Sequence, residues 1–444
     1  MTPLRGLLRV GVRIFFRRIA IAGGDQVPAT GPVLFVLNHP NSLIDPVLLL
    51  AFAPRPVVFL AKEPLFRTPV VRWFVRAMGS IPVYRRQDAA DMTQNRHTFA
   101  RVWEVMQRGG AVALFPEGGS HNDPTLRPLK TGAARLALGA TAIGSGRTVS
   151  IVPAGLYYTA KWRFRSSAVL RFGAPITVSP GQLDANGEPE SDAVRALTAR
   201  LEEALADVTL QADRQEALDL VAMAERVFSS TATAPDAIPP LERRFELRQE
   251  FMRGYQLLRT TQPGRIARLE RDLERYLAEL DAAGLAPESV PPVRLSFATA
   301  SGYAARTAGF LLVTAPLAVI GIVVHLPAYL VIGPFVTRAL DVERDVFATG
   351  KMLVAGLLYP ITWAIITTLV WRRLGAAAGV ITLAILPLSG YVALLFVERF
   401  DRLVGAARGV LLRIFRRRAW LRLDARRRRI AAEIEDLAAL RTSV

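Results

Sequence analysis

The chain has 444 residues, a length that predicts two or more structural units, because single hydrophobic cores rarely grow so large. Hydrophobic residues make up 51% of it, and 56 lysines and arginines against 38 acidic residues give a formal net charge of +18, which favours a membrane protein contacting anionic lipid over a nucleic-acid-binding protein. The absence of cysteine excludes disulfides, thiolate metal sites and cysteine nucleophiles.

Residues 1–24 alternate arginine with large apolar residues, and no apolar run there reaches the length of a signal-peptide core. We therefore expect no cleaved signal peptide. The pattern fits a basic amphipathic helix on a membrane surface, and a terminal helix docked on the rest of the protein explains it equally well.

Residues 25–185 alternate short apolar runs with helical stretches, which is typical of an α/β domain. The runs are nearly all apolar, as in strands that are covered on both faces, and glycine or proline marks their ends. The expected strands are 33–37, 57–60, 111–115, 151–156 and 169–172.

The first motif, residues 38–46, directly follows an expected strand and contains His39 and Asp45. A histidine at the end of a strand is exposed enough to meet a substrate. A nearby carboxylate can keep one ring nitrogen protonated, so that the other nitrogen accepts a hydroxyl proton. Asp45 precedes Pro46, however, and this order also fits a helix N-cap, which is the alternative role for the carboxylate.

A second motif, residues 115–121, reads Phe-Pro-Glu-Gly-Gly-Ser-His and again ends an apolar run. Adjacent Gly118 and Gly119 let backbone amides approach an anion. Arg127 and Lys130 follow, with a helix expected from about residue 131, and together these groups can clamp a phosphate.

Two weaker motifs accompany these. Residues 79–85 form an expected tight turn that ends in Arg85. Proline at position 153 interrupts the apolar run 151–156, which predicts an edge strand lining a cleft.

The C-terminal half falls into three regions. Residues 186–300 carry charges around leucines at helical spacing, which predicts a charged helical region without chemistry of its own. Residues 305–400 hold three stretches without Asp, Glu, Lys or Arg, at 307–337, 352–371 and 374–397, each long enough to cross a bilayer. Residues 401–444 form a basic tail with arginine runs at 416–418 and 426–429.

The number of crossings depends on the stretch 307–337, which contains three prolines and is either one tilted helix or a hairpin. With the α/β domain and the basic tail both in the cytoplasm, the positive-inside rule requires an even number of crossings. We therefore expect a hairpin there, and four crossings in place of three.

In order and spacing, the four motifs resemble those of the glycerol-3-phosphate and lysophospholipid acyltransferase superfamily, and most of all its fungal-type glycerol-3-phosphate/dihydroxyacetone-phosphate branch. The resemblance covers about residues 25–180 and rests on Asn-Ser-Leu-Ile-Asp-Pro at 41–46, on the segment 115–132 and on residues 164–175. Five residues separate His39 from Asp45, as they do in that branch. Most other members of the superfamily have four residues between the histidine and the aspartate. Gly119 and Ser120 replace the usual Thr-Arg, so one expected cation is missing.

This resemblance implies an α/β domain whose mixed sheet is flanked by helices, followed by the helical region and the transmembrane helices. It also implies transfer of a fatty acyl group from acyl-CoA or acyl-carrier protein to glycerol 3-phosphate or dihydroxyacetone phosphate, with the catalytic domain on the cytoplasmic face. His39 would be the general base and Asp45 its orienting carboxylate. Residues expected to bind the acceptor are Arg85, Glu117, Gly118, Gly119, Ser120, Arg127 and Lys130, and those expected to line the acyl-donor cleft are Pro153 and Gly155.

Two other functions stay open. The acceptor could already carry one acyl chain, as 1-acylglycerol 3-phosphate does, or the chain could be an inactive membrane scaffold that binds anionic lipid. For the enzyme we expect no metal, no cofactor besides the acyl donor, and no nucleic-acid partner.

Overall fold

The computed structural model describes residues 2–68, 71–84, 95–143, 148–180, 183–184, 187–231, 239–287, 290, 297–339 and 347–442. The chain divides into two compact units. One comprises Met1–Asp213 with Glu343–Thr349, and the other comprises Arg214–Val342 with Gly350–Val444. The boundaries expected at residues 24/25 and 185/186 therefore do not separate units, because the elements on both sides of them belong to the first unit.

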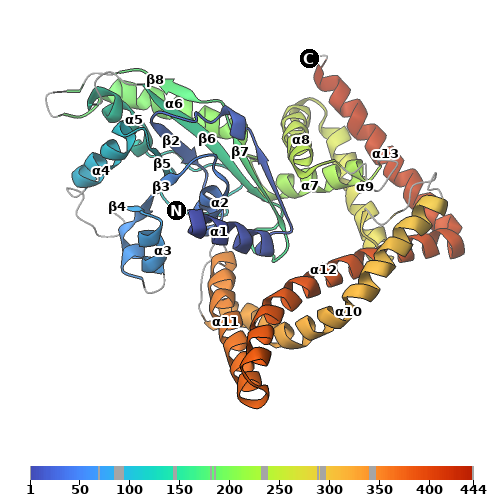
Figure 1. Ribbon diagram of the computed structural model, residues 1–444. Helices are drawn as coiled ribbons and strands as arrows, with labels where there is room; N and C mark the ends of the chain where they lie inside the picture. The colour runs from blue at the N-terminus through green and yellow to red at the C-terminus, as the bar shows by residue number, and fades with distance from the viewer. Residues whose placement is uncertain are drawn as a thin grey trace. The chain divides into compact units, whose positions relative to one another are not determined.

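The first unit is built on a mixed sheet, which has eight strands in the described residues (Figure 1). The strands are β1 (Arg18–Ala22), β2 (Val33–Leu37), β3 (Val57–Lys62), β4 (Ile81–Val83), β5 (Ala111–Leu114), β6 (Val149–Tyr158), β7 (Ser167–Phe172) and β8 (Ile176–Val178). Their order is β1-β7-β6-β2-β5-β3-β4, with β8 also paired to β6. β2 runs parallel to β5 and β6, whereas β7 and β8 are antiparallel to β6, so the α/β class with a mixed sheet is confirmed.

Strand β2 is apolar throughout because both of its faces are covered, and all five of its residues are buried. Leu34 and Val36 share a core with residues of α4 (Asn95–Gln107), α5 (Gly132–Ile143) and α6 (Ser191–Val208). Figure 1 shows α5 and α6 on one side of the strands, with α1 and α2 on the other. The loops at the strand ends are thus held by a sheet buried on both sides.

Helix α1 (Thr2–Phe15) is docked through one face and exposed on the other. Leu8 packs with Ala51 of α2 (Ile44–Phe52). Arg5 and Arg9 donate hydrogen bonds to the carbonyl oxygen of Ala51, one of the last carbonyls of α2 that lack a partner within the helix. The opposite face presents an exposed apolar stripe of Leu7, Val10 and Ile14.

Residues 18–22 were expected to belong to the same surface segment as α1. They form the edge strand β1 instead, because their backbone groups pair in parallel with β7, from Arg18 opposite Ser167 to Ala22 opposite Arg171.

The prediction that residues 151–156 form an edge strand is wrong, because β6 lies inside the sheet. Pro153 is paired with Val36 on one side. On its other side, the carbonyl oxygen of Pro153 accepts a hydrogen bond from the N–H of Gly173 at 2.8 Å, where pairing with β7 ends and pairing with β8 begins. The N–H that proline lacks would point to this same side, so the proline interrupts neither ladder.

Gly155, expected in the acyl-donor cleft, lies against the C-terminal end of α6. A Cβ at this position would overlap the backbone carbonyl of Val208, the last residue of the helix. The glycine therefore lets α6 approach β6, and the structure gives it a packing role.

We expect Gly155→Ala to lower the free energy of unfolding by about 1–3 kcal/mol, because the helix must move away from the strand to admit the methyl group. Thermal unfolding of the purified protein measures this. Gly11→Ala in α1 is the matched control, since a Cβ there meets no atom within 4 Å. Equal melting temperatures of the two variants would contradict the packing role.

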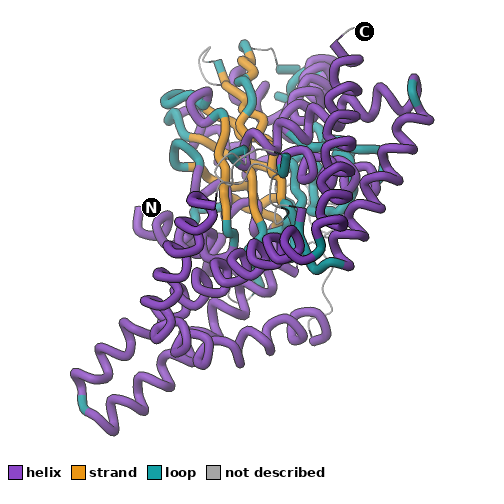
Figure 2. The backbone as a smooth tube through the Cα atoms, turned by 90° about the vertical axis from the view of Figure 1, so that its right-hand side faces the viewer, coloured by secondary structure: helices purple, strands orange, loops and turns teal. Residues whose placement is uncertain are grey.

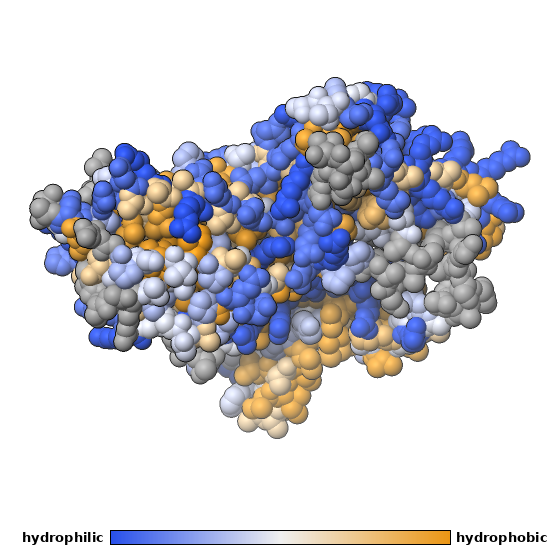
Figure 3. Space-filling view, turned by 90° about the horizontal axis from the view of Figure 1, so that it is seen from above, coloured by the Kyte–Doolittle hydropathy of each residue, from blue (hydrophilic) through white to orange (hydrophobic). Residues whose placement is uncertain are grey.

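The second unit contains, among the described residues, three apolar helices that are long enough to cross a membrane: α10 (Phe297–Pro334), α11 (Phe347–Leu374) and α12 (Ala376–Phe415). Figure 2 shows α11 and α12 as a hairpin, whose teal tip is the turn at Gly375. Large apolar side chains remain exposed along all three helices, and they give the orange surface at the lower edge of Figure 3. The chain is therefore a membrane protein.

The hairpin expected within residues 307–337 is wrong. Those residues lie in α10 and the π-helical turn Phe335–Ala339 that continues it, with Pro316 and Pro327 inside the helix. An apolar helix tolerates proline when a neighbouring helix packs against it. α10 packs along α12, where Gly321 and Gly390 leave room for close approach, so the described residues offer three candidate crossings and not four.

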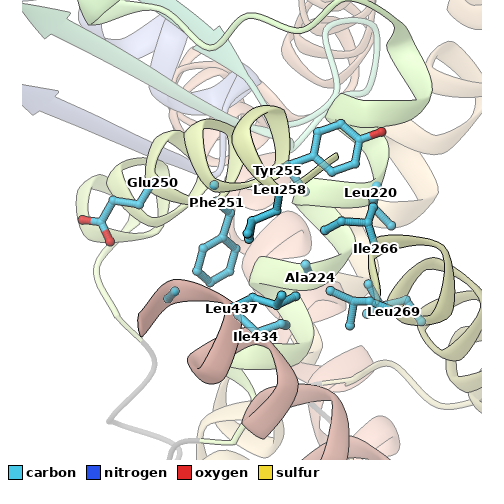
Figure 4. A pocket seen from close by; sticks show the side chains of 14 residues that line it. Leu220, Ala224, Glu250, Phe251, Tyr255, Leu258, Ile266, Leu269, Ile434 and Leu437 are labelled. Carbon is cyan, nitrogen blue, oxygen red and sulfur yellow. The ribbon is translucent and has the colours of Figure 1, made fainter. Parts of the chain in front are cut away.

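A bundle of α7 (Gln215–Ser229), α8 (Leu241–Thr261), α9 (Pro263–Ala282) and α13 (Arg417–Thr442) completes the described part of the second unit. The four helices line an apolar pocket of about 240 Å³ that is partly open to solvent (Figure 4). Its lining includes Leu220 of α7, Phe251 of α8, Leu269 of α9 and Ile434 of α13.

A charged cluster is buried in the same bundle. The side chain of Glu225 on α7 has no exposed surface, and its carboxylate accepts hydrogen bonds from Arg244 at 2.6 Å, Arg248 at 2.7 Å and Ser229 at 2.7 Å. Two cations thus compensate one buried anion, and they tie α8 to α7.

Helix α13 is part of this bundle and not a free tail. Arg265 of α9 forms ion pairs with Glu433 and Asp436 of α13, and Arg426 pairs with Glu279 at 2.9 Å. Asp424 forms ion pairs with Arg427 and Arg428 of the same helix. Three of the four arginines at 426–429 are therefore engaged within the protein.

Candidate active site

The first two motifs meet at one edge of the sheet. β2 and β5 are parallel neighbours, so the loops after them begin side by side. The backbone N–H of His39 donates to Glu117 Oε1 at 2.8 Å, and the N–H of His121 donates to the carbonyl of His39 at 3.1 Å.

The imidazole of His39 is held from two directions. Its Nδ1 lies 2.8 Å from Asp45 Oδ2, and its ring stacks on Phe115 with 3.8 Å between centroids and 7° between planes. A carboxylate accepts hydrogen bonds, so Nδ1 carries the proton and Nε2 presents a lone pair. Nε2 has no partner in the part of the chain that the structure describes, and 16% of the side chain is exposed, which suits a base facing a bound substrate.

Asp45 is fully buried, and three donors reach its carboxylate: Nδ1 of His39, the N–H of Asn41 at 2.7 Å and the hydroxyl of Tyr158 at 2.6 Å. The capping role considered for Asp45 is wrong, because Leu43 is the N-cap of α2 and Asp45 lies inside the first turn. The carboxylate is directed at the histidine.

The loop from His39 to Asp45 includes a left-handed turn. Ser42 has φ of +42°, a conformation that L-residues adopt at some cost. The turn lets a carboxylate six positions along the chain return to the imidazole.

Tyr158 is a site residue that the sequence motifs did not indicate. Burial, the charge of Asp45 and the hydrogen bond between them raise the pKa of Tyr158 well above its usual value, so the phenol stays a donor. Its only signal in the sequence is a tyrosine at the end of a strand, 113 positions from its partner.

Glu117, expected to bind substrate, is buried and engaged with the protein. Oε1 accepts from His39, while Oε2 accepts from the N–H of Arg127 at 3.1 Å and from Nε2 of His121. The N–H of Asp123 donates to Nδ1 of His121, so Nε2 is the protonated nitrogen. The carboxylate therefore joins the loop of His39 to the segment 121–127.

The glycine turn lies beside these residues. Gly118 has φ of +79°, and the side chain of Lys130 lies so close over it that a Cβ would collide with the ammonium end. An added Cβ at Gly119 would meet nothing within 4 Å, so the backbone there is open to a ligand. Ser120 follows and is partly exposed.

The cations around the turn differ in their engagement. The Nε of Arg127 donates to Asp123 at 2.6 Å, a bond that lowers the pKa of Asp123, so its charge is already paired. Lys161 in the loop after β6 was not indicated by any motif. Its carbonyl accepts from the Asn41 side chain and its Nζ lies 3.5 Å from Asn122 Oδ1, which brings a further cation to this edge.

Two sets of predicted site residues remain. Arg85 lies outside the described residues, so its role in binding the acceptor stays a prediction. Pro153 and Gly155, which were expected to line the acyl-donor cleft, are interior positions of β6. Pro153 is buried and Gly155 is covered by α6, so neither residue forms the wall of an open cleft among the described residues.

Comparison with known families agrees with the motifs. Residues 18–157 match the acyltransferase family, and residues 221–440 match the glycerol-3-phosphate acyltransferase 2 C-terminal domain. The chain thus combines an acyltransferase domain with a glycerol-3-phosphate acyltransferase 2 C-terminal domain. The second match also gives a family to the helical unit, for which the sequence indicated no chemistry.

Relatives in yeast resemble the chain over most of its length. Glycerol-3-phosphate O-acyltransferase 1 of Saccharomyces cerevisiae is 26% identical over 81% of this chain and 60% of its own length, and O-acyltransferase 2 is 28% identical over 83% and 65%. The 1-acyl-sn-glycerol-3-phosphate acyltransferase of Borreliella burgdorferi is 27% identical over 35% of this chain and 58% of its own length. The chain thus spans 60% and 65% of the yeast proteins.

Proposed function

We propose that the protein transfers a fatty acyl group from an acyl thioester, acyl-CoA or acyl-carrier protein, to the hydroxyl of glycerol 3-phosphate, with dihydroxyacetone phosphate as a further acceptor. The observation that carries this proposal is the His39–Asp45 pair beside the open glycine turn. The names of the yeast relatives, whose similarity covers 81% and 83% of this chain, support glycerol 3-phosphate as the acceptor, and the acylated product of that reaction fits a place in phospholipid synthesis.

In this mechanism Nε2 of His39 removes the proton of the acceptor hydroxyl as the oxygen attacks the thioester carbonyl. Asp45 stabilises the imidazolium that forms. When the carbon–sulfur bond breaks, the departing thiolate takes the proton from His39, so the products are an ester and a free thiol. The open backbone at Gly119, with Lys130 and Lys161, would hold the acceptor phosphate. That no metal or cofactor is needed stays a prediction.

Membranes containing the protein, incubated with labelled acyl-CoA and each acceptor in turn, test this assignment. We expect the highest kcat/KM with glycerol 3-phosphate. A preference for 1-acylglycerol 3-phosphate would transfer the assignment to the activity named for the Borreliella relative. No turnover with glycerol 3-phosphate, dihydroxyacetone phosphate or 1-acylglycerol 3-phosphate would favour the alternative function, an inactive membrane scaffold that binds anionic lipid.

We further propose that the first unit works on the cytoplasmic face with the outer stripe of α1 in the lipid surface. Leu7 and Val10 are 65% and 56% exposed. Trp73 of α3 (Val71–Ala77) is 63% exposed between Arg72 and Arg76, and a tryptophan flanked by arginines suits the headgroup region.

Replacement of Leu7, Val10 and Ile14 by serine is expected to reduce turnover about tenfold in anionic lipid vesicles. These three apolar side chains would anchor the exposed face of α1 by inserting into the lipid surface. The same variant in detergent micelles is the control and should match the wild type. Equal turnover of both proteins in vesicles would refute the docking of this face.

A further inference from the structure

Tyr158 connects the interior of the sheet to the catalytic pair. It is the last residue of β6 and is 5% exposed, and its ring stacks on Phe16 with 5.4 Å between centroids. Its hydroxyl donates to Asp45 Oδ1 at 2.6 Å, within the usual range for a hydroxyl bonded to a carboxylate. The phenol does not reach the exposed edge where a substrate would bind.

The two oxygens of Asp45 have separate tasks. Oδ2 accepts from His39 and from the backbone of Asn41, whereas Oδ1 accepts from Tyr158. Rotation of the carboxylate would break bonds on both sides. The hydroxyl of Tyr158 is the one of the three described donors that comes from the sheet. The other two donors, on His39 and Asn41, lie in the loop that contains His39 itself.

We propose that Tyr158 is a positioning residue of the acyl transfer, which fixes Asp45 in the orientation that holds Nδ1 of His39, so that Nε2 stays directed at the acceptor hydroxyl. This inference rests on the proposed function. Tyr158 acts through Asp45 and touches no reacting atom.

Tyr158→Phe tests the proposal, because it removes the hydroxyl and keeps the ring that stacks on Phe16. We expect kcat to fall about tenfold with KM for both substrates unchanged. Tyr157→Phe, the neighbouring residue on the opposite face of β6, is the control and should match the wild type.

If Tyr158 acts through Asp45, then replacing Tyr158 should have no further effect on kcat in a variant whose Asp45 is already changed. In an Asp45→Asn background, adding Tyr158→Phe is expected to lower kcat no further, since the two changes interrupt the same chain of hydrogen bonds. A second fall of about tenfold would contradict action through Asp45.

A readout that needs no turnover separates this inference from the proposed function. Diethylpyrocarbonate modifies imidazole nitrogen, and peptide mass spectrometry reports the rate at His39 alone at one fixed pH. The rate should rise in Tyr158→Phe even if no acceptor is acylated, because Asp45 then holds the ring less firmly, and in that case only the proposed function fails. Wild-type kcat and a wild-type modification rate would overturn the inference, and so would a fall in kcat with a lower melting temperature and an unchanged modification rate.

Discussion

Replacing His39 with alanine is expected to lower kcat of acyl transfer by about 10²–10⁴-fold, the contribution of a positioned general base. The ring also stacks on Phe115 and bonds the buried Asp45, so the melting temperature is measured together with the rate. Initial rates with labelled acyl-CoA measure the effect, and circular dichroism checks the fold.

His97→Ala provides the matched control for this variant. His97 lies exposed on α4 and belongs to neither the His39 loop nor the Glu117 loop, and its replacement should leave kcat unchanged. Wild-type turnover by the His39 variant would end the assignment of the catalytic base.

The largest loss of stability is expected from Glu225→Ala in the helical bundle. The change leaves Arg244 and Arg248 without their buried anion, and such a loss costs about 3–5 kcal/mol. For a unit of this size the melting temperature should fall by roughly 10 °C. Glu246→Ala is the control, because its pair with half-exposed Arg243 is screened by solvent and contributes at most about 1 kcal/mol.

The acid dependence of this effect has a defined sign. Burial alone raises the pKa of Glu225, but the hydrogen bonds and charges of Arg244 and Arg248, with the bond from Ser229, outweigh it and hold the pKa below the ordinary value of 4.5. A carboxyl whose pKa is lowered on folding stabilises the protein above its unfolded pKa, and this is lost as pH falls through the folded value. The difference in unfolding free energy between wild type and Glu225→Ala should therefore be constant near neutral pH and shrink below 4.5. A difference that grows in acid would contradict the assignment.

The main strands were predictable because strands covered on both faces are apolar at every position. The expected run 33–37 coincides with β2, and 111–115 exceeds β5 by one residue. β4 and β8 have three residues each, too few to show a period, and β1 begins at an arginine that continues the pattern of α1. The interior position of β6 was missed because Pro153 suggests an edge unless the change of partner from β7 to β8 is known.

The meeting of His39 with the segment of Glu117 was predictable for a simple reason. Adjacent parallel strands end at one edge, and both motifs follow such strands. Tyr158 and Lys161 were not predictable, because their partners lie more than 100 positions away and only the strand order brings β6 beside β2. Nor could the sequence show that Glu117 turns inward, since the same turn could have presented the carboxylate to solvent.

The helical region shows the opposite limit. Its charged residues indicated a solvated surface, yet Glu225 and Arg248 are buried against each other. Spacing along one helix shows where a charged side chain points but not that another helix covers it with the opposite charge.

Because α13 packs against α7–α9, the chain enters the first apolar helix, α10, and leaves the last one, α12, on the same side of any lipid layer. α9 precedes α10 and α13 follows α12, and Arg265 joins them through its pairs with Glu433 and Asp436. Three complete passages would separate these partners by the thickness of the hydrocarbon layer, about 30 Å. Parity therefore allows only two of the three helices to traverse the layer, and the third must return to the leaflet it entered or lie along its surface.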